Sequence, residues 1–437
     1  MIKKMQDIFN IPELRRRLLF TIALLIVYRI GGNITTPGVN PQALKVFFQN
    51  QQGTIFALYD LSAGGNLRRA TIFALGIMPY ISASIIIQLL QAVIPYFEKL
   101  AKEGEEGRKK ITQYTRYGTV GLAAVQSFGT TILLENMAPG GVPVVIMGGI
   151  QFKLLTMVTL TAGTIFVMWL GEQITERGIG NGISLIIMVG IIARYPTDFL
   201  NTWRALKLGQ ITPFRLVLLL VIMVFVIGGV ILITQGQRRL PVQYAKRIVG
   251  RKVYGGRAQY IPLRVNTAGV IPIIFAQSIM MFPSTIAAIP VLRQSEFMAQ
   301  VQTILSPGSW LYLSLYGLII VFFTYFYTAI ILNPVDLAEN MRKYGGFIPG
   351  IRPGKRTADY IDRILTRITL PGAIFLAFIA ILPDLMMRQG GLPFYFGGTG
   401  LLIVVGVMLD TLQQIETHLL MRHYDGFMKK GRLRGRR

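Results

Sequence analysis

The chain has 437 residues, of which 52% are hydrophobic and 15% are charged, and it contains no cysteine. A mean hydropathy of +0.51 is far above that of a soluble globular domain, and the lack of cysteine excludes disulfides, thiolate metal sites and cysteine nucleophiles. The net charge of +25 is compatible with a nucleic-acid ligand, with anionic lipid or with an asymmetric membrane topology.

A membrane-spanning helix needs about 20 mostly apolar residues. Such stretches recur along the chain at residues 18–36, 75–97, 117–134, 153–171, 183–200, 214–234, 268–290, 310–332, 368–387 and 399–421. Basic residues precede the first stretch, but no small-residue cleavage site follows it closely, so it is predicted to be an uncleaved membrane helix. The sequence therefore predicts an all-α integral membrane protein with ten transmembrane helices.

The connections between these stretches differ in charge. Of the 45 Lys and Arg residues, 34 fall in alternate connections, on one side of the membrane, at residues 1–17, 98–116, 171–182, 235–265, 333–368 and 422–437. The positive-inside rule places this side, and with it both termini, in the cytoplasm. The net positive charge of the chain is therefore explained by the excess of Lys and Arg in its cytoplasmic connections. These basic loops are also suited to contact with ribosomal RNA.

Ten spans divide into two halves of five, residues 1–200 and 201–421, followed by a basic tail at 422–437. An odd number of helices in each half gives the halves opposite orientations, as in many inverted-repeat transport proteins. The sequence shows no strong internal repeat, so the predicted pseudo-symmetry rests only on the odd number of helices in each half. It predicts a pathway between the two halves.

Residues 54–74 interrupt the pattern, because Ser62–Ala70 reads SAGGNLRRA and includes Arg68 and Arg69. Arginines that face lipid at bilayer depth are costly, and irregular polar backbone is tolerated there only against protein or water. Two interpretations remain open from the residues alone. The segment is either a loop outside the membrane or a short half-helix in an aqueous vestibule.

Catalytic and metal-binding motifs are absent from the sequence. The glycines of Gly178–Gly182 lack the spacing of a dinucleotide fingerprint and predict a tight turn between two membrane helices. His418 and His423 are too few for a metal site. Asp410 is the clear acidic residue within the spans, and ion-coupled transporters usually keep more carboxylates at the membrane midplane. We expect no cofactor. The sequence also lacks the group of catalytic residues that a membrane-bound enzyme would need.

Isoleucines recur every four residues in two of the predicted spans. Ile77, Ile81 and Ile85 share one helix face, and Ile183 and Ile187 repeat this spacing. Such isoleucines either face lipid, pack against other helices or line a narrow pathway. The spacing alone does not show that these helices meet.

Two basic connections, residues 235–265 and 333–368, are long, and the glycines and prolines of the second predict fixed, protruding hairpins. Cationic hairpins of this kind suit an acidic partner surface.

Six long stretches resemble the SecY family, the channel subunit of the bacterial Sec translocon. They are IFALGIMPYISASIIIQLL (72–90), KEGEEGRKKITQYTRYGT (102–119), GEQITERGIGNGISLII (171–187), NTAGVIPIIFA (266–276), YGGFIPGIRPGKRT (344–357) and YFGGTGLLIVVGV (395–407). The resemblance implies an hourglass channel that passes unfolded secretory chains and releases apolar segments sideways into lipid. A secondary transporter of small solutes is the alternative.

The resemblance also implies roles for individual residues. The pore ring is expected at Ile77, Ile81, Ile183, Ile187, Ile274 and Ile403, and a re-entrant plug half-helix at 62–70 is expected to use Ser62, Gly64, Gly65, Asn66, Arg68 and Arg69. The lateral gate is expected at Ser82, Gln126 and Phe282, and the motor or ribosome contact at Arg247, Arg251, Lys252, Arg352, Lys355 and Arg356.

By the same resemblance, the expected partners are SecE and SecG subunits, the SecA ATPase or the ribosome, substrates with signal sequences, and membrane lipid. The expected location is the bacterial cytoplasmic membrane.

Overall fold

The computed structural model describes residues 11–44, 60, 63–137, 143–146, 148–209, 212–244, 247–249, 252–254, 258–287, 309–390 and 398–430. The chain groups into two compact units. Unit 1 comprises Met1–Asn201, Ser278–Pro307 and Val407–Arg437, and unit 2 comprises Thr202–Gln277 and Gly308–Gly406. Unit 1 thus contains segments of both predicted halves, and the division into halves at residues 1–200 and 201–421 stays a prediction.

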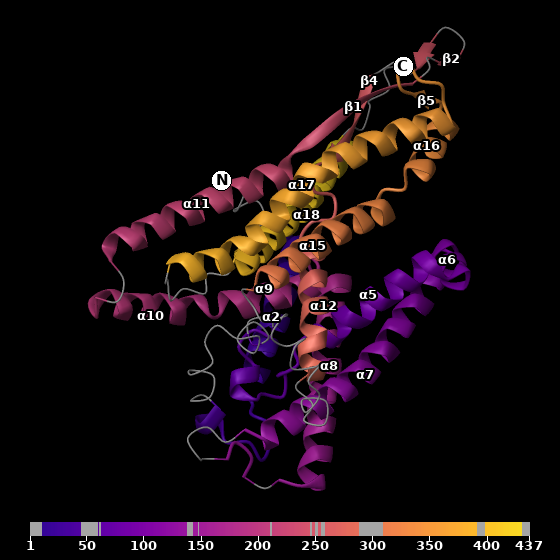
Figure 1. Cartoon of the computed structure of the whole chain (residues 1–437). Coiled ribbons are helices and arrows are strands. Elements are labelled where there is room, and N and C mark those ends of the chain that lie inside the picture. The colour runs from indigo at the N-terminus through magenta and orange to yellow at the C-terminus, as the bar shows by residue number, and fades with distance from the viewer. Residues whose placement is uncertain are drawn as a thin grey trace. The chain divides into compact units, whose positions relative to one another are not determined.

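Each of the ten predicted spans coincides with a helix (Figure 1). The helices are α2 (Pro12–Gly31), α5 (Met78–Val93) with α6 (Pro95–Lys102), α7 (Glu105–Glu135), α8 (Ile150–Arg177), α9 (Gly182–Ile192) with α10 (Tyr195–Lys207), α11 (Pro213–Gln235), α12 (Ile271–Ala287), α15 (Trp310–Ile331), α17 (Lys355–Gly390) and α18 (Gly398–Lys430).

Among the described residues, seven helices are long and apolar enough to cross a membrane, and the bent pair of α5 and α6 makes an eighth. The two remaining predicted spans correspond to α2 and α12. Arginines in the first turns of α2 lower its hydropathy, and α12 has 17 residues. The chain is a multi-pass membrane protein.

Proline and asparagine set the ends of two helices in unit 1. The helices α5 and α6 meet at an angle of 98°, because Ile94 adopts an extended conformation before Pro95 and the helix cannot continue through it. The side chain of Asn181 accepts hydrogen bonds from the N–H groups of Ile183 and Ser184, which caps the start of α9. The break at Pro95 falls within one continuous apolar stretch, whereas the cap at Asn181 lies at the turn that the sequence predicts.

Helices α7 and α8 of unit 1 are joined by polar contacts along their length. The guanidinium of Arg116 forms an ion pair with Glu172, and Lys153 forms one with Glu135. Between these pairs, the hydroxyls of Ser127 and Thr161 lie 3.3 Å apart. Helix α5 packs against α7, and Figure 1 shows the two running side by side.

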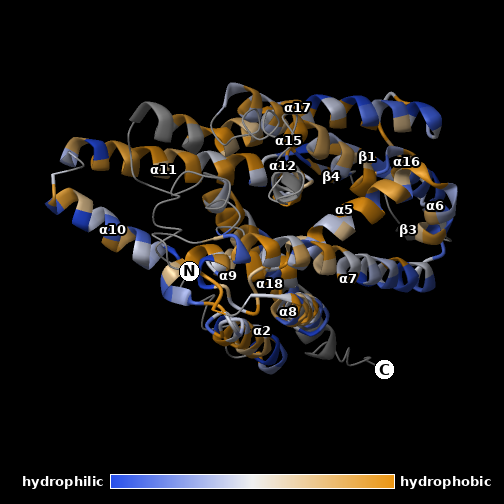
Figure 2. Cartoon of the chain, turned by 60° about the horizontal axis from the view of Figure 1, so that its bottom comes forward, coloured by the Kyte–Doolittle hydropathy of each residue, from blue (hydrophilic) through white to orange (hydrophobic). Residues whose placement is uncertain are grey.

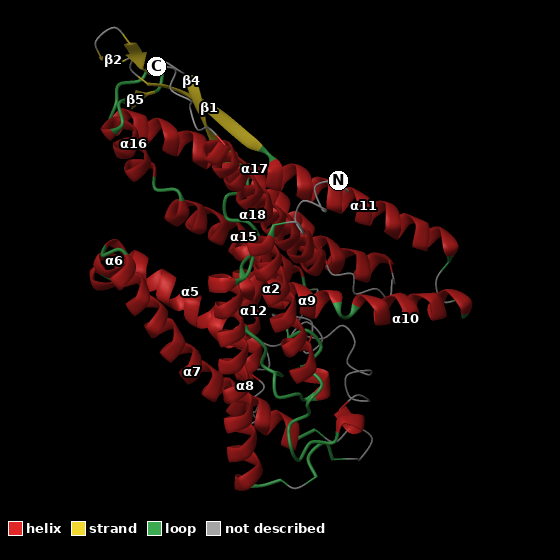
Figure 3. Cartoon of the chain, turned by 180° about the vertical axis from the view of Figure 1, so that it is seen from behind, coloured by secondary structure: helices red, strands yellow, loops and turns green. Residues whose placement is uncertain are grey.

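Unit 2 carries the strands (Figure 3). Strands β1 (Gln237–Tyr244), β4 (Ala258–Arg264) and β5 (Gly346–Phe347) form an antiparallel sheet in the order β4-β1-β5. A second hairpin joins β2 (Arg247–Val249) to β3 (Lys252–Tyr254), and α16 (Pro334–Lys343) precedes β5.

The sheet of unit 2 packs on α16 and the start of α17. In the second half of β1 the side chains alternate between the two faces, so Leu240 and Val242 are buried with Met341 of α16 and Ile361 of α17. By contrast, α11 is hydrophobic along nearly its whole length and largely exposed (Figure 2). A helix of this kind suits contact with lipid.

Candidate functional site

The predicted plug, residues 62–70, lies in unit 1. Ser62 lies outside the described residues, and Ala63–Leu67 are buried. Gly64 and Gly65 have φ values of +70° and +81°, which favour glycine because other residues are strained there. One turn of 3-10 helix, Leu67–Arg69, ends the segment.

The two arginines of this segment have different surroundings. The Arg68 side chain is 31% exposed, and its Nε lies 3.8 Å from a carboxylate oxygen of Asp60. Arg69 is exposed and donates a hydrogen bond of 2.7 Å to the side chain of Asn33. Burial lowers the pKa of Arg69, and repulsion from Arg68 and Arg29 lowers it further. Both arginines therefore have polar protein partners.

The buried Asn66 ties this segment to α2, because its side-chain amide donates to the hydroxyl of Tyr28 at 3.2 Å and to the carbonyl oxygen of Ala63 at 2.7 Å. The residues that follow continue the attachment. The ring of Phe73 stacks between Tyr28 of α2 and Phe166 of α8, with centroids 5.8 and 6.0 Å away.

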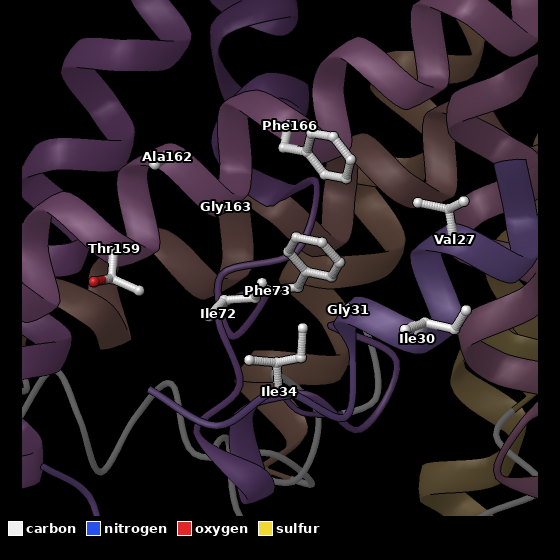
Figure 4. Close-up of a pocket in the computed structure, with 10 residues that line it drawn as sticks. All are labelled: Val27, Ile30, Gly31, Ile34, Ile72, Phe73, Thr159, Ala162, Gly163 and Phe166. Carbon is white, nitrogen blue, oxygen red and sulfur yellow. The ribbon is translucent and has the colours of Figure 1, made fainter. Parts of the chain in front are cut away.

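A cavity of about 650 Å³ lies beside Phe73 (Figure 4). Its walls come from α2, α8 and the chain after the plug, and apart from Thr159 the residues that line it have no polar side chain: Val27, Ile30, Gly31, Ile34, Ile72, Phe73, Thr159, Ala162, Gly163 and Phe166. A Cβ atom at Gly31 would lie 2.2 Å from the ring of Phe73, and one at Gly163 would lie 1.9 Å from the carbonyl oxygen of Ile72. The two glycines therefore let this chain segment lie against both helices.

The predicted ring residues come from both units. Ile77, Ile81 and Ile187 of unit 1 are buried and Ile183 is half-buried, while Ile274 and Ile403 are buried in unit 2. Ile183 faces α8, because a Cβ atom at Gly171 would lie 3.1 Å from its side chain. Their meeting in one ring stays a prediction.

Two of the predicted gate residues lie on neighbouring helices. Ser82 of α5 is half-buried, and Gln126 of α7 is 9% exposed with an amide oxygen that has no hydrogen-bond partner among the described residues. The side chain of Phe282 lies outside the described residues. Helix α12 nevertheless meets α5 within unit 1, where the hydroxyl of Ser278 lies 3.9 Å from the sulfur of Met78.

The predicted partner contact lies on the sheet-bearing part of unit 2. Arg352, Lys355 and Arg356 are all exposed. Gly350 and Gly354, with φ values of +81° and +106°, turn the chain on either side of Arg352. The hydroxyl of Thr357 donates to the carbonyl oxygen of Arg352 at 2.9 Å, which fixes the backbone from which the guanidinium projects.

The remaining three predicted contacts fall on the β2–β3 hairpin. Arg247 and Lys252 lie on paired strands, but their side chains are outside the described residues, as is Arg251.

The glycine-rich stretch Gly178–Gly182 forms the turn between α8 and α9 that the sequence predicts. Protein groups satisfy its N–H donors, since Ile179 donates to the hydroxyl of Thr21 and Gly180 donates to the side chain of Gln414. Gly182 likewise donates to the hydroxyl of Thr175. These donors are therefore not free to bind a phosphate group.

The sequence interpretation missed Asp60, which is 2% exposed, and Arg194, whose side chain is 11% exposed. The Oδ2 atom of Asp60 lies 3.6 Å from Nη1 of Arg194, and its Oδ1 atom accepts a hydrogen bond of 2.9 Å from the N–H group of Arg68. Burial raises the pKa of the Asp60 carboxyl, and Arg194 and the Arg68 N–H group oppose this rise. The sequence feature that indicates a role for Asp60 is its place as a single acidic residue just before the glycines of the plug.

Comparison with known proteins identifies the family. The family model described as SecY matches residues 71–412. The protein translocase subunit SecY of Aquifex aeolicus (strain VF5) is 47% identical, over 98% of this chain and 100% of that relative. The chain belongs to the SecY family. The resemblance found in the sequence motifs is thus confirmed.

Solved structures show the same fold as this SecY-family chain. One, described as a protein conducting channel, has a TM-score of 0.65 at 19% identity and covers 92% of each chain. Another concerns the plug domain of a SecY protein, which its description says stabilises the closed state of the translocation channel and maintains a membrane seal. It has a TM-score of 0.63 at 18% identity and also covers 92% of each chain.

Proposed function

We propose that this SecY-family chain is a protein-conducting channel that passes unfolded secretory proteins across the membrane and releases hydrophobic segments sideways into lipid. The observation that carries this proposal is the plug segment. Buried turns with positive φ angles, followed by two arginines with polar protein partners, lie within a unit built of apolar helices. Irregular backbone at membrane depth is tolerated only where it is buried in protein or lines an aqueous cavity, so the segment indicates a pathway.

The plug and the isoleucine ring would close this pathway at rest. Branched aliphatic side chains offer no group that solvates an ion, and water leaves a narrow apolar constriction. The same side chains can seal around many different residues of a passing chain without binding any of them strongly. The ring is proposed at Ile77, Ile81, Ile183, Ile187, Ile274 and Ile403.

The lateral gate would lie between α5 and α7 on one side and α12 and α15 on the other. An apolar segment in the channel gains free energy by leaving water for hydrocarbon, so a seam that can part lets it leave sideways. The contact between Met78 and Ser278 supports this location, because it brings α12 against α5. The buried amide of Gln126 adds a polar group beside the seam.

The energy for transport would come from partners. We propose that SecE and SecG complete the complex and that the SecA ATPase or the ribosome docks on the basic surface around Arg352, Lys355 and Arg356. The chain itself would not be an enzyme. The proposed location is the bacterial cytoplasmic membrane, and the positive-inside rule supports an orientation with both termini in the cytoplasm.

Reconstitution into vesicles tests the proposal. The full chain, purified with its small subunits, should import a secretory protein that carries a signal sequence when the translocating ATPase and ATP are added. The matched substrate without a signal sequence should stay outside. Import of a small solute with no import of the secretory protein would favour the secondary transporter instead.

A further inference from the structure

The plug segment lies directly on α9 at a contact between two glycines. A Cβ atom built on Gly64 would lie 2.8 Å from the Cα atom of Gly190, and one built on Gly190 would lie 2.8 Å from the Cα atom of Gly64. Gly190 is in the last turn of α9, and both glycines are buried. The two backbones therefore touch, and a side chain at either position requires the plug to move away from the helix.

A buried ion pair lies beside this contact. Arg194 follows Gly190 by four residues, just beyond the end of α9, and its Nη1 atom lies 3.6 Å from Asp60. Among the described residues, Nε and Nη1 of Arg194 have no hydrogen-bond partner, so the Asp60 carboxylate within ion-pair distance provides a counter-charge, and the Asp198 carboxylate adds a further electrostatic attraction.

The same carboxylate holds the plug. Its Oδ1 atom accepts the N–H group of Arg68, and the backbone carbonyl oxygen of Asp60 accepts the N–H group of Gly65 at 2.7 Å. Asp60 therefore connects the two ends of the glycine-rich turn to α9 through Arg194. The chain after the plug has its own attachment, because Phe73 is stacked between α2 and α8.

We propose that Asp60 and Arg194 are positioning residues that hold the plug on α9. The plug touches α9 where its Gly64 packs against Gly190. This inference depends on the proposed sealing role of the plug. Breaking the contact at α9 would leave the turn at Gly64 and Gly65 held by the hydrogen bond from Asn66 to Tyr28 of α2, while Phe73 keeps the following chain in place. The pair thus sets how readily the plug leaves its closed position.

The physical chemistry of buried ion pairs gives a sharp expectation. Removing one partner leaves a buried charge without compensation, whereas removing both partners is often nearly neutral. Asp60→Asn or Arg194→Gln should each raise the resting ion conductance of the reconstituted channel at least about tenfold. The double variant should leak less than either single variant, and Arg194→Lys should remain close to the parent.

A matched control comes from a second ion pair of unit 1. Glu172 has an 11% exposed side chain and pairs with Arg116 between α7 and α8. Glu172→Gln should lower thermal stability without raising the resting conductance. A leak that merely follows loss of stability would appear in this control as well, and that result would overturn the proposal.

The glycine contact supplies an independent test should Asp60→Asn fail to assemble. Gly190→Ala should displace the plug and raise the resting conductance. Gly129→Ala is its control, because Gly129 is also a buried helical glycine but has no neighbouring atom within 4 Å of an added Cβ. Equal conductance in the two alanine variants contradicts the proposed docking.

Deletion of residues 62–70 separates this inference from the proposed function. If the deletion variant is as tight as the parent, the segment is not the seal and both proposals fail. If the deletion variant leaks while Asp60→Asn, Arg194→Gln and Gly190→Ala all stay tight, the plug stands and the positioning role of Asp60 and Arg194 is wrong. Leakage in the deletion and in the single variants, with recovery in the double variant, is the expected result.

Discussion

The guanidinium of Arg116 on α7 donates hydrogen bonds of 2.9 and 2.8 Å to the two carboxylate oxygens of Glu172 on α8. The glutamate side chain is 11% exposed and the arginine side chain 46% exposed. A bidentate arginine–carboxylate pair fixes both the distance and the orientation of the groups it joins. This pair therefore holds two spans of the SecY-family chain in register.

We expect Arg116→Lys to lower the free energy of unfolding by about 1 kcal/mol, because lysine cannot form the two parallel hydrogen bonds and the partly exposed pair is weakened by water. Thermal unfolding of the purified protein in detergent measures this change. The ion pair of Lys102 with Glu98, whose side chains are 74% and 57% exposed, is the comparison. Lys102→Ala should leave the unfolding temperature unchanged, and an equal loss in both variants would contradict the expectation.

In Arg194→Gln, the seal should depend on pH through Asp60. Burial raises the pKa of the Asp60 carboxyl, and Arg194 opposes this rise in the parent, so removal of Arg194 raises the pKa further. Without Arg194, protonation removes a buried unpaired charge, so docking in this variant is favoured below the raised pKa and weakens as the pH rises through it. Resting conductance between about pH 8 and pH 5 should fall with acid in Arg194→Gln and stay flat in Asp60→Asn. A flat profile in both variants would exclude Asp60 as the titrating group.

The membrane-spanning helices were predictable because a stretch of about 20 apolar residues is a local property of the sequence. Their interruptions are less visible. The break between α9 and α10 falls at Ala193 and Arg194, inside a window that is apolar on average. Within the basic connection 235–265, the apolar residues Leu240 and Val242 stand two positions apart, with polar residues on either side. This spacing is the local feature that indicates strand β1.

The pairing of Asp60 with Arg194 could not be predicted from the sequence. The two residues are 134 positions apart, and no periodicity links a single acid to a cation at that distance. Gly190 likewise has no local feature that separates it from other glycines in spans, such as Gly129. Its role depends on the backbone of Gly64, which only the folded chain brings near.

The ring residues should control the resting conductance. Replacing Ile81 and Ile187 by serine adds hydroxyl groups that can hold water in the constriction, so ions should pass more readily when no chain is present. Planar-bilayer recording measures this conductance. Ile86→Ser on the same helix is the control, because Ile86 is 48% exposed while Ile81 is 4% exposed. If the variant with serine at both positions conducts no more than the parent, Ile81 and Ile187 do not line the constriction.

Arg352 should be needed for transport that a partner drives. Arg352→Glu places a negative charge on a surface proposed to meet an acidic partner, so the partner should bind weakly and export should fall to background. The channel itself should still insert into the membrane in normal amounts. Arg204→Glu gives the control, because Arg204 is an exposed arginine of α10 outside the basic connections. Export at the parent's rate by Arg352→Glu would contradict the proposed contact.

The lateral gate can be tested with cysteines, because the parent has none. Met78 and Ser278 are in contact, which brings α5 and α12 together, and the SecY resemblance assigns Ser82 of α5 and Phe282 of α12 to the gate. We predict that Ser82→Cys with Phe282→Cys forms a disulfide across the closed seam, which needs Cα atoms within about 7 Å. Oxidation should then block export, and reduction should restore it.

The two single-cysteine variants should export normally under oxidation, which separates a closed gate from damage by the oxidant. Loss of export in the double variant alone, reversed by reduction, means that α5 and α12 must part during transport. If the pair cross-links and a signal-bearing substrate still crosses freely, the seam does not open for transport. If oxidised vesicles contain no cross-linked chain, the two positions do not face each other, and the proposed register of the seam between α5 and α12 is wrong.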